Sequence, residues 1–286
     1  MRENKMKKIR IAAAGDNCMD VYDKENKAFP GGNPVNVAVY VARLGGASAY
    51  IGPVGTDVYG KQMMDAIQGK GVDVSRMKIL EGTTAVTHVE IVDGDRVLGD
   101  YEEGVMADFK LDAEDIDFLS SYDMVVSGLW GMIENDLPVL KEKGAIVAFD
   151  FATRPDDPVS VKAIPYVDYG FFADDDKDEE ELKKMLIDLH AKGPKVMVVT
   201  RGEKGSMAYD GEKFYYGGIV PCEVVDTMGA VYVQPSCYVE PVDTMGAGDS
   251  FIAGFLYAIC EGKGIQEAMA DGAANSSVTI AYSGAW

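Results

Sequence analysis

Apolar and polar positions follow two kinds of pattern along most of the chain. Short, nearly continuous apolar runs predict buried strands at 7–15, 47–55, 122–130, 144–151, 167–173 and 194–200. Stretches with apolar residues at helical spacing lie between and after them, at 33–46, 57–71, 134–144, 179–193, 247–262 and 265–284. Because strands without a polar face need cover on both sides, this pattern predicts an α/β fold. We expect a mostly parallel central sheet with helices on both faces.

One segment departs from this alternation of buried strands and amphipathic helices. Residues 83–104 alternate polar and apolar positions over two runs joined by Asp93-Gly94, which is typical of a β-hairpin with one exposed face. Such a hairpin can be core, edge or lid. Its polar face is rich in Thr, His, Glu and Asp, so we favour a small β lid formed mainly by about 84–103, with 17–30 contributing. Because the sequence contains no stretch typical of a linker, residues 1–286 are expected to form a single domain.

Composition removes several classes of function. The formal net charge is −20, and beyond the short KMKK near the start there is no basic cluster, which argues against a nucleic-acid partner. No segment has the length of a membrane span, and the first apolar run is too short for a signal peptide. The four cysteines lack pairing or zinc spacing, and the two histidines cannot build a histidine cage. We therefore expect a cytoplasmic protein.

The most informative stretch is DTMGAGDSFIAGF at 243–255. Gly246, Ala247 and Gly248 are small and immediately precede a helix, where bare backbone N–H groups can hold an anion. Asp249, in the first turn, is placed to accept a proton from an attacking hydroxyl while those amides stabilise a phosphoryl group. The alternative is that Asp249 only caps the helix.

Other glycine-rich turns add to this picture. PGGNPVNVAVY at 30–40 places Gly32 and Asn33 before a helix and Asn36 one turn further on, which suits a polyhydroxy ligand or a plain capped helix. TRGEKG at 200–205 follows a strand and is a weak signal alone. GTDVYGKQ at 55–62 nearly fits a P-loop, but Gln62 stands where a Ser or Thr should bind magnesium.

Together these stretches resemble the ribokinase-like (pfkB) family of sugar kinases. GDNCMD, PGGNPVNVAVYVARLG, VGTDVYG, TRGEKGS and DTMGAGDSFIAGF occur in that family's order and spacing. The resemblance implies ATP as phosphoryl donor, Asp249 as general base and Gly246, Ala247 and Gly248 as the anion hole. It also implies a sugar site at Asp16, Asp20, Gly32, Asn33 and Asn36, and a nucleotide site at Thr200, Gly202, Gly205 and Asn275.

Two departures from the family pattern concern the sugar and the metal. The family's D-x-N-x-R stretch is here Asp150, Ala152 and Arg154, with alanine in place of the asparagine, and the resemblance implies Arg154 at the sugar or the γ-phosphate. Its N-x-x-E stretch, which serves Mg²⁺ through water, is replaced by acidic residues at 173–181. Of these Asp178 is our candidate, although such a run is usually a solvated helix start. The resemblance also implies a K⁺ site near Asp243.

The substrate follows from the narrower resemblance. NKAFPGGNPVNVAVY, DRVLGDYEEGVMADF, the WG of LWGMIE and the terminal GAW are similar to members that phosphorylate the 6-hydroxyl of a fructosyl-amine such as fructoselysine. We expect lid acids to pair with the substrate amine, and the lid's exposed sheet face to support a homodimer. Alternatives are a fructokinase, a 2-keto-3-deoxygluconate kinase or an impaired sugar- and nucleotide-binding protein. The candidate lid acids are Glu90, Asp100, Glu102 and Glu103.

The stretch VDTMGA occurs twice, at 225–230 and 242–247. After the first copy, Val231 and Tyr232 replace the Gly and Asp that follow the second copy. The first copy therefore cannot supply the base. We interpret the pair as a short tandem duplication, with about 222–238 forming an inserted loop or hairpin near the active site.

Overall fold

The computed structural model describes residues 8–92, 95–219, 224–225, 231–232, 244–282 and 284–286. Most of the expected insertion at 222–238, the Asp93-Gly94 turn and Asp243 lie outside the described residues. Within that segment, β15 (Val224–Val225) pairs antiparallel with β16 (Val231–Tyr232).

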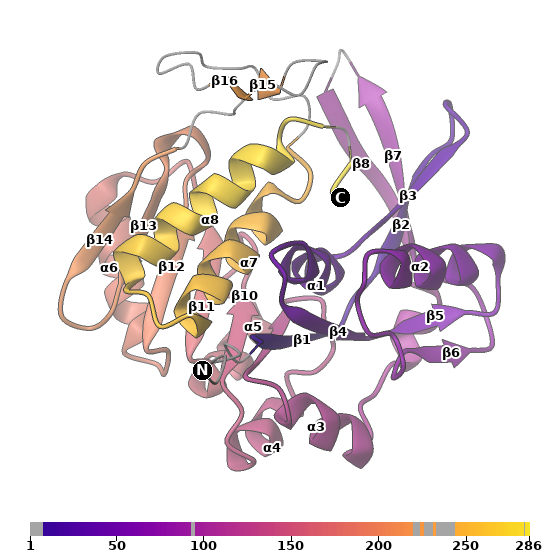
Figure 1. The fold of residues 1–286 in the computed structure, drawn as a ribbon, viewed down its shortest axis with the longest axis horizontal. Coiled ribbons are helices and arrows are strands. Elements are labelled where there is room, and N and C mark those ends of the chain that lie inside the picture. Colours follow the sequence, from indigo (N-terminus) through magenta and orange to yellow (C-terminus); the bar gives the residue numbers. More distant parts are fainter. Residues whose placement is uncertain (1–7, 93–94, 220–223, 226–230, 233–243, 283) are drawn as a thin grey trace, which may run out of the picture.

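The main element is an eight-stranded sheet in the order β14-β13-β12-β11-β10-β9-β1-β4 (Figure 1). The pairs between β12 and β4 are all parallel, and only β12–β13 and β13–β14 are antiparallel. The expected mostly parallel sheet is confirmed. Its strands are β1 (Arg10–Ala14), β4 (Ala47–Ile51), β9 (Met124–Gly128), β10 (Val147–Asp150), β11 (Tyr169–Ala173), β12 (Val196–Thr200), β13 (Ser206–Tyr209) and β14 (Phe214–Gly217).

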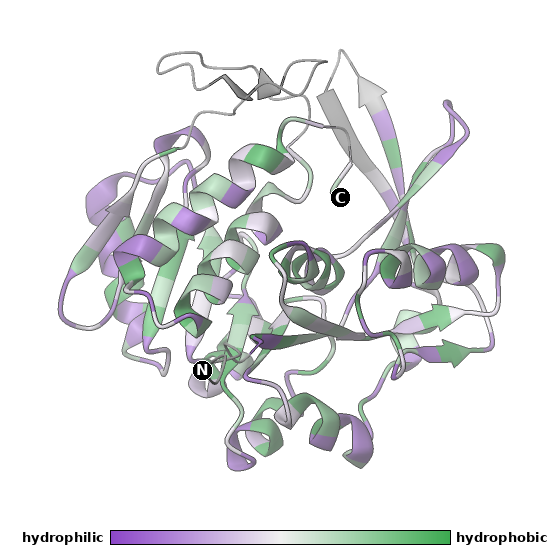
Figure 2. Cartoon of the chain, viewed as in Figure 1, coloured by the Kyte–Doolittle hydropathy of each residue, from purple (hydrophilic) through white to green (hydrophobic). Residues whose placement is uncertain are grey.

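Alternation along β1 divides the interior into two cores. Ile11 and Ala13 pack with α1 (Asn33–Arg43) and α7 (Ala247–Cys260), and α8 (Ile265–Thr279) packs beside α7. Ala12 and Ala14 point to the opposite core, which contains residues of α3 (Ala113–Ser120), α4 (Leu137–Glu142), α5 (Pro158–Ala163) and α6 (Glu179–His190). Figure 2 shows the central strands mostly hydrophobic and the hydrophilic positions gathered on outer elements such as α2 (Val58–Gly69). The sheet is therefore covered on both faces.

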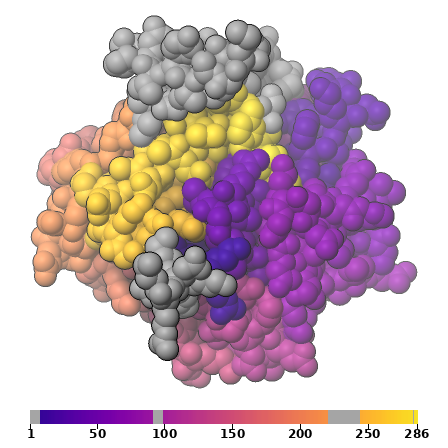
Figure 3. Space-filling model, in the orientation of Figure 1, coloured from indigo at the N-terminus to yellow at the C-terminus, as the bar shows by residue number. Residues whose placement is uncertain are grey.

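The end of the chain packs beside its beginning. In Figure 3 the yellow C-terminal segment lies directly against the purple N-terminal part of the chain. Contacts between α1 and α7 account for this proximity. Among the described residues, no helix combines the length and hydrophobicity that a membrane span requires.

A second, four-stranded sheet has the order β3-β2-β7-β8 and projects beside the main body (Figure 1). It consists of β2 (Cys18–Tyr22), β3 (Lys27–Gly31), β7 (Val86–Val92) and β8 (Asp95–Glu102). The segments that we expected to form a lid thus make one sheet. Its action as a lid stays a prediction.

The expected single strand at 47–55 is wrong. The chain breaks at Gly52 into β4 and β5 (Pro53–Gly55), and β5 pairs with β6 (Lys78–Leu80) in a separate two-stranded sheet. A Cβ at Gly52 would lie 1.9 Å from the Tyr50 hydroxyl and 2.6 Å from the Gly15 carbonyl oxygen. The glycine therefore allows a close approach at which the chain leaves the main sheet.

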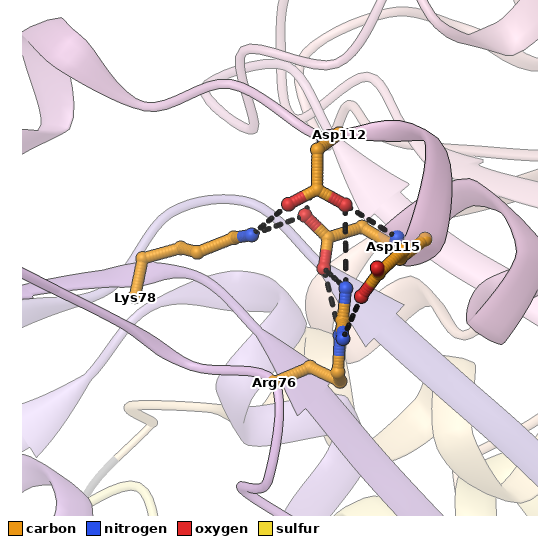
Figure 4. A network of polar contacts seen from close by, with 5 residues as sticks. Arg76, Lys78, Asp112 and Asp115 are labelled. Atoms are coloured by element: carbon orange, nitrogen blue, oxygen red, sulfur yellow. Dashed lines mark hydrogen bonds and ion pairs between the residues drawn. The ribbon is translucent and has the colours of Figure 1, made fainter.

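An ion-pair network ties this small sheet to α3 (Figure 4). Arg76 Nη2 lies 2.8 Å from Asp115 Oδ1, and Lys78 Nζ lies 2.6 Å from both Asp115 Oδ2 and Asp112 Oδ2. Asp112 and Asp115 also form the capping box that begins α3. The Asp115 side chain is fully buried, so these partners offset the cost of its desolvation.

Candidate active site

Three buried or nearly buried carboxylates meet where the parallel strands end. Asp16 follows β1, Asp150 is the last residue of β10, and Asp249 lies in the first turn of α7. Ligands of open α/β sheets bind outside these carboxyl ends of strands. The structure thus brings together two of the expected site residues, Asp16 and Asp249, with Asp150, which the sequence marked only as part of an altered motif.

Helix α1 supplies one amide to each of two carboxylates. Asn33 Nδ2 donates to Asp150 Oδ2 at 2.8 Å, and one turn later Asn36 Nδ2 donates to Asp249 Oδ2 at 2.7 Å. The helix starts after Gly32, whose φ is 118° and whose Cβ, if present, would lie 2.6 Å from Asn17 Cα. Glycine is needed there because no side chain fits between the two backbones.

The start of α7 presents an open backbone surface. Gly246 is the left-handed N-cap, with a φ of 73°, and a Cβ there would press on Ala285 and the Tyr40 hydroxyl. At Gly248 an added Cβ would meet nothing within 4 Å. The turn is therefore tight on its inner side and open at Gly248, where an anion can approach the backbone of the helix terminus. The Ala247 N–H donates to the Thr244 carbonyl at 3.2 Å.

Helix α8 holds this terminus in place. Ser276 Oγ donates to the Ala247 carbonyl at 2.6 Å, and Asn275 Nδ2 donates to the Ser250 carbonyl at 2.7 Å. The Asn275 amide, expected near the nucleotide, thus has a structural contact that the sequence did not indicate. These bonds fix the first turn of α7 and with it Asp249.

Burial raises the pKa of all three carboxyl groups. For Asp249 the pKa lies well above its usual value, because of burial and then the charge of Asp150, with a smaller effect of Asp16; the Asn36 amide opposes the shift. For Asp16 burial raises the pKa to about 6, against hydrogen bonds from the backbone N–H groups of Asp16 and Asn33. The pKa of Asp150 is raised by burial too, opposed by the Ala152 N–H and by Asn33. Such a cluster is suited to accept protons near neutral pH.

Two buried oxygens beside this cluster accept no hydrogen bond from the described residues, namely Asp16 Oδ1 and Asn17 Oδ1. Asn17 Nδ2 donates to the Tyr50 hydroxyl at 2.9 Å and to the Pro53 carbonyl at 2.7 Å, which fixes the loop after β1. Because unsatisfied buried acceptors are costly, a hydrogen-bond donor that reaches these oxygens would be stabilising. The sequence did not indicate Asn17 and Tyr50. Their hydrogen bonds join residues 15–17 to residues 50–53, and these two segments meet only in the folded chain.

The other candidate residues, those expected at the nucleotide and Arg154, differ in their local contacts. Thr200 ends β12, Gly202 begins a 3-10 turn (Gly202–Lys204) with open space around it, and Gly205 packs against the Gly217 carbonyl. Arg154 Nη2 forms an ion pair with Asp157 Oδ2 at 2.6 Å. Its guanidinium is thus engaged at the start of α5.

The metal candidates receive little structural support. The Asp178 carboxylate accepts from the Glu181 N–H and forms a capping box at the start of α6, while Asp243 lies outside the described residues. Within the part of the chain that the structure describes, no group of three or more His, Cys, Asp or Glu side chains could hold a metal ion. A magnesium bound mainly by nucleotide phosphates needs only one or two carboxylates, so this finding is compatible with that mode.

Alternation in the second sheet separates the candidate lid acids. Asp20 on β2 lies opposite Thr87 on β7, which lies opposite Tyr101 on β8, so these three side chains share one face. Glu90 and Glu102 belong to the other face, that of His88. There Glu102 lies 3.4 Å from His88 Nε2, and Glu90 Oε1 lies 3.3 Å from Lys24 Nζ.

The face of Asp20 is the one directed at the carboxylate cluster. The charges of Cys18, Asp16 and Glu103 contribute, after burial, to raising the pKa of Tyr101 to about 12. Glu90 and Glu102 therefore point away from the site, and they have partners of their own in Lys24 and His88. Asp20 and Glu103 are the acids nearest to the inner face.

Comparison with known proteins gives consistent matches. The family model of the pfkB family carbohydrate kinases matches residues 9–230 and 231–286. The chain is 42% identical over 276 residues to the fructoselysine 6-kinases of Shigella flexneri and Escherichia coli (strain K12), covering 96% of this chain and 99% of each relative. It is 32% identical over 283 residues to fructosamine kinase FrlD of Bacillus subtilis (strain 168), covering 97% and 93%.

Solved structures agree on the fold. The Arabidopsis thaliana ribokinase complexed with ribose and ATP superposes with a TM-score of 0.81 at 21% identity, covering 98% of this chain and 94% of the other. The fructokinase with bound ATP from Xylella fastidiosa gives a TM-score of 0.73 at 20% identity, covering 96% and 93%. The two pieces of the family match meet directly after the first VDTMGA.

Proposed function

Because the chain belongs to the pfkB family of carbohydrate kinases, we propose that it transfers the γ-phosphoryl group of ATP to the 6-hydroxyl of fructoselysine or a related fructosyl-amine. The observation that carries this proposal is the buried Asp249 at the open start of α7, in a chain 42% identical to two fructoselysine 6-kinases. The expected absence of nucleic-acid and membrane partners belongs to the same proposal.

In the proposed reaction Asp249 accepts the proton of the attacking hydroxyl. The Asn36 amide orients its carboxylate, and burial together with the charge of Asp150 raises its pKa, which strengthens it as a proton acceptor. The backbone N–H groups at Gly246, Ala247 and Gly248 stabilise the charge of the transferring phosphoryl group at the positive end of α7. The Ala247 N–H, which donates to the Thr244 carbonyl at 3.2 Å, exchanges that acceptor for a phosphoryl oxygen. Asp249 thus acts on the attacking hydroxyl, and the helix terminus acts on the phosphoryl group that the hydroxyl attacks.

The sugar is proposed to lie against Asp16 and the start of α1. Asp16 Oδ1 and Asn17 Oδ1 can accept hydrogen bonds from its hydroxyl groups, while Asn33 and Asn36 remain bonded to their carboxylates. We place Asp20 at the end of the substrate that carries the amine. There the carboxylate and the Tyr101 ring share one face, so both an ion pair and a cation–π contact are available to an ammonium group.

The nucleotide is proposed to lie along Thr200, Gly202, Gly205 and Asn275. The open space at Gly202 and the helix terminus at Gly248 suit phosphates, which approach bare backbone closely. Mg²⁺ would neutralise phosphate charge during transfer, with Asp178 reaching it through water, and K⁺ would bind near Asp243. No step of the proposed proton transfer to Asp249 depends on these metal residues.

Two further properties are part of the proposal. The second sheet acts as a lid that excludes water, and its exposed face and its edge strands, β3 and β8, provide a homodimer surface. Sedimentation at several protein concentrations measures the dimer. The enzyme is proposed to work in the cytoplasm, where ATP is available.

The decisive experiment measures ADP release with fructoselysine, fructose and 2-keto-3-deoxygluconate, for wild type and Asp249→Asn. We expect turnover of fructoselysine by wild type and a loss of about 10²-fold or more in kcat for the variant, with sugar and nucleotide binding retained. Faster turnover of fructose or 2-keto-3-deoxygluconate would contradict the assignment of fructoselysine as the substrate. Binding of both ligands without turnover by wild type would instead favour the sugar-binding protein.

The amine contact needs its own comparison. We expect Asp20→Asn to lower the preference for fructoselysine over fructose, while the double variant Glu90→Gln/Glu102→Gln leaves that preference unchanged, since its side chains lie on the opposite face. The opposite ranking of these two variants would contradict the proposed orientation of the substrate.

A further inference from the structure

The indole of Trp286 reaches the carboxylate that we propose as general base through a single residue. Trp286 Nε1 donates to Asn36 Oδ1 at 2.6 Å, and Asn36 Nδ2 donates to Asp249 Oδ2 at 2.7 Å. Both contacts are within normal hydrogen-bond range. The two polar ends of one amide are therefore used by an indole on one side and a buried carboxylate on the other.

The chemistry of the three groups permits only one orientation of the amide. An indole N–H can only donate, so it requires the oxygen of Asn36. A rotation of the amide by half a turn would place its NH₂ against the indole N–H and its oxygen against the Asp249 carboxylate. Both contacts would then be repulsive when Asp249 is ionised.

The tail that carries Trp286 is held by its own contacts. The preceding residue, Ala285, is buried, and its carbonyl oxygen accepts a hydrogen bond from the Tyr40 hydroxyl on α1. Lys70 Nζ lies 5.5 Å from the centroid of the Trp286 ring, a cation–π distance. The indole is thus fixed from α1 and from the end of α2, which allows it to hold Asn36 in turn.

We propose that Trp286 is a positioning residue for phosphoryl transfer: its N–H locks the Asn36 amide so that the NH₂ faces Asp249 and favours the ionised carboxylate. This inference rests on the proposed function. The charged and titratable groups around Asp249 are Asp150 and Asp16 from the strand ends and Tyr40 from α1, and Lys70 lies on the far side of the indole. The two aspartates disfavour ionisation of Asp249, so the Asn36 amide is the contact that opposes them.

The test is Trp286→Phe, which keeps an aromatic ring and removes the donor. We expect kcat to fall about three- to tenfold at pH values below the acid limb, with KM changed less than kcat. Losing a hydrogen bond to the ionised form raises the pKa of Asp249, so the acid limb of the kcat profile should move to higher pH by about half a unit to one unit. At pH values above that limb, kcat should recover toward wild type.

Two controls separate positioning from a structural effect. In an Asn36→Ala background, adding Trp286→Phe should produce no further shift of the acid limb, since the indole acts through Asn36. Tyr122→Phe, which keeps the ring and removes a hydroxyl just before β9, at the opposite end of the strands from the carboxylate cluster, should leave the profile unchanged. An equal loss of kcat at every pH, or the same shift in the Asn36→Ala background, would refute the proposal.

A measurement on the unmodified chain covers the case in which Trp286→Phe does not fold. The chain has two tryptophans, so Trp130→Phe assigns the two indole N–H resonances directly. The Trp286 resonance should titrate with the midpoint of the acid limb in wild type and should not titrate in Asp249→Asn. A Trp286 chemical shift that does not change with pH in wild type would contradict the inference. If wild type has no kinase activity, this titration still tests the hydrogen-bonded contact separately from the proposed function.

Discussion

Asn36 Nδ2 lies 2.7 Å from Asp249 Oδ2, although 213 positions of sequence separate the two residues. The same helix, α1, reaches Asp150 through Asn33. Opposite ends of the chain thus meet at the carboxylate cluster, and the packing of α1 on α7 fixes the distance between them. Substitutions at that helix contact should consequently affect turnover, even where they touch no ligand.

Asp16→Asn should stabilise the ligand-free protein at high pH. Burial raises the pKa of Asp16 from 3.8 to about 6, so wild type is favoured with this group protonated and loses that stability as pH rises through about 6. Asparagine cannot ionise. Its gain in free energy of unfolding should be near zero below about pH 4 and approach roughly 3 kcal/mol above pH 6.

Urea denaturation at pH 4 and pH 8 measures this difference. Asp188→Asn, at an exposed position, serves as the control and should give nearly the same small change at both pH values. An equal gain for Asp16→Asn at pH 4 and pH 8 would contradict the argument from ionisation. We expect turnover by Asp16→Asn to be strongly reduced, because asparagine replaces an anionic carboxylate with one neutral acceptor oxygen and an NH₂ donor.

Asp115→Asn should destabilise the protein through the network of Figure 4. The change leaves Arg76 and Lys78, each about a quarter exposed, without their buried carboxylate. Removing one partner of a buried pair is costly, and we expect a loss of about 3 kcal/mol in the free energy of unfolding.

Glu114→Gln is the matched control for that variant. Glu114 bonds the same Arg76 at 3.0 Å, but its side chain is 83% exposed, so its loss should cost less than about 1 kcal/mol. Chemical denaturation of both variants decides the point. Equal losses would mean that burial of Asp115 contributes nothing to the strength of the network.

Ala152→Asn should stabilise the fold. Ala152 has a φ of 50°, a left-handed conformation that Asn tolerates better than Ala, and its N–H bonds to Asp150 Oδ1 at 2.9 Å. We expect a gain of about 1 kcal/mol, while the β-branched Ala152→Val should lose at least as much. Thermal unfolding of the pair measures the difference, and stabilisation by valine would exclude backbone strain as the cause.

Deleting residues 222–238 should preserve or raise kinase activity. The segment carries the first VDTMGA, which lacks the Gly-Asp of the second copy, and the family match breaks immediately after it at residue 230. The deletion brings the second copy to the position that the family's spacing requires. A variant that folds, as judged by circular dichroism, but has lost all activity would show that the segment contributes to the site.

The sequence was most informative where local chemistry decides the structure. Apolar strands predicted the parallel sheet, and the helix expected from residue 57 begins where the Asp57 side chain accepts from the Gly60 N–H at 2.8 Å. The small residues before Asp249 predicted the helix start at α7. These features depend on neighbours within a few positions, which is the range that periodicity and capping rules describe.

Contacts between distant segments could not be predicted in this way. The break at Gly52 depends on Gly15 and Tyr50, and the contact of Trp286 with Asn36 depends on where the last residues pack. The lid acids seemed equivalent in sequence, yet pairing across β7 and β8 places Glu90 and Glu102 on the outer face. A register is a property of two strands together, so neither strand reveals it alone.

The three carboxylates at the strand ends also make ligand binding a protonation event. Burial raises the pKa of each group, and that of Asp16 to about 6, so part of the population carries a proton on Asp16 near neutral pH. Hydroxyl groups that donate to the ionised carboxylates favour loss of those protons. Substrate affinity therefore weakens as pH falls, and the heat of binding depends on the ionisation enthalpy of the buffer that takes up the released protons.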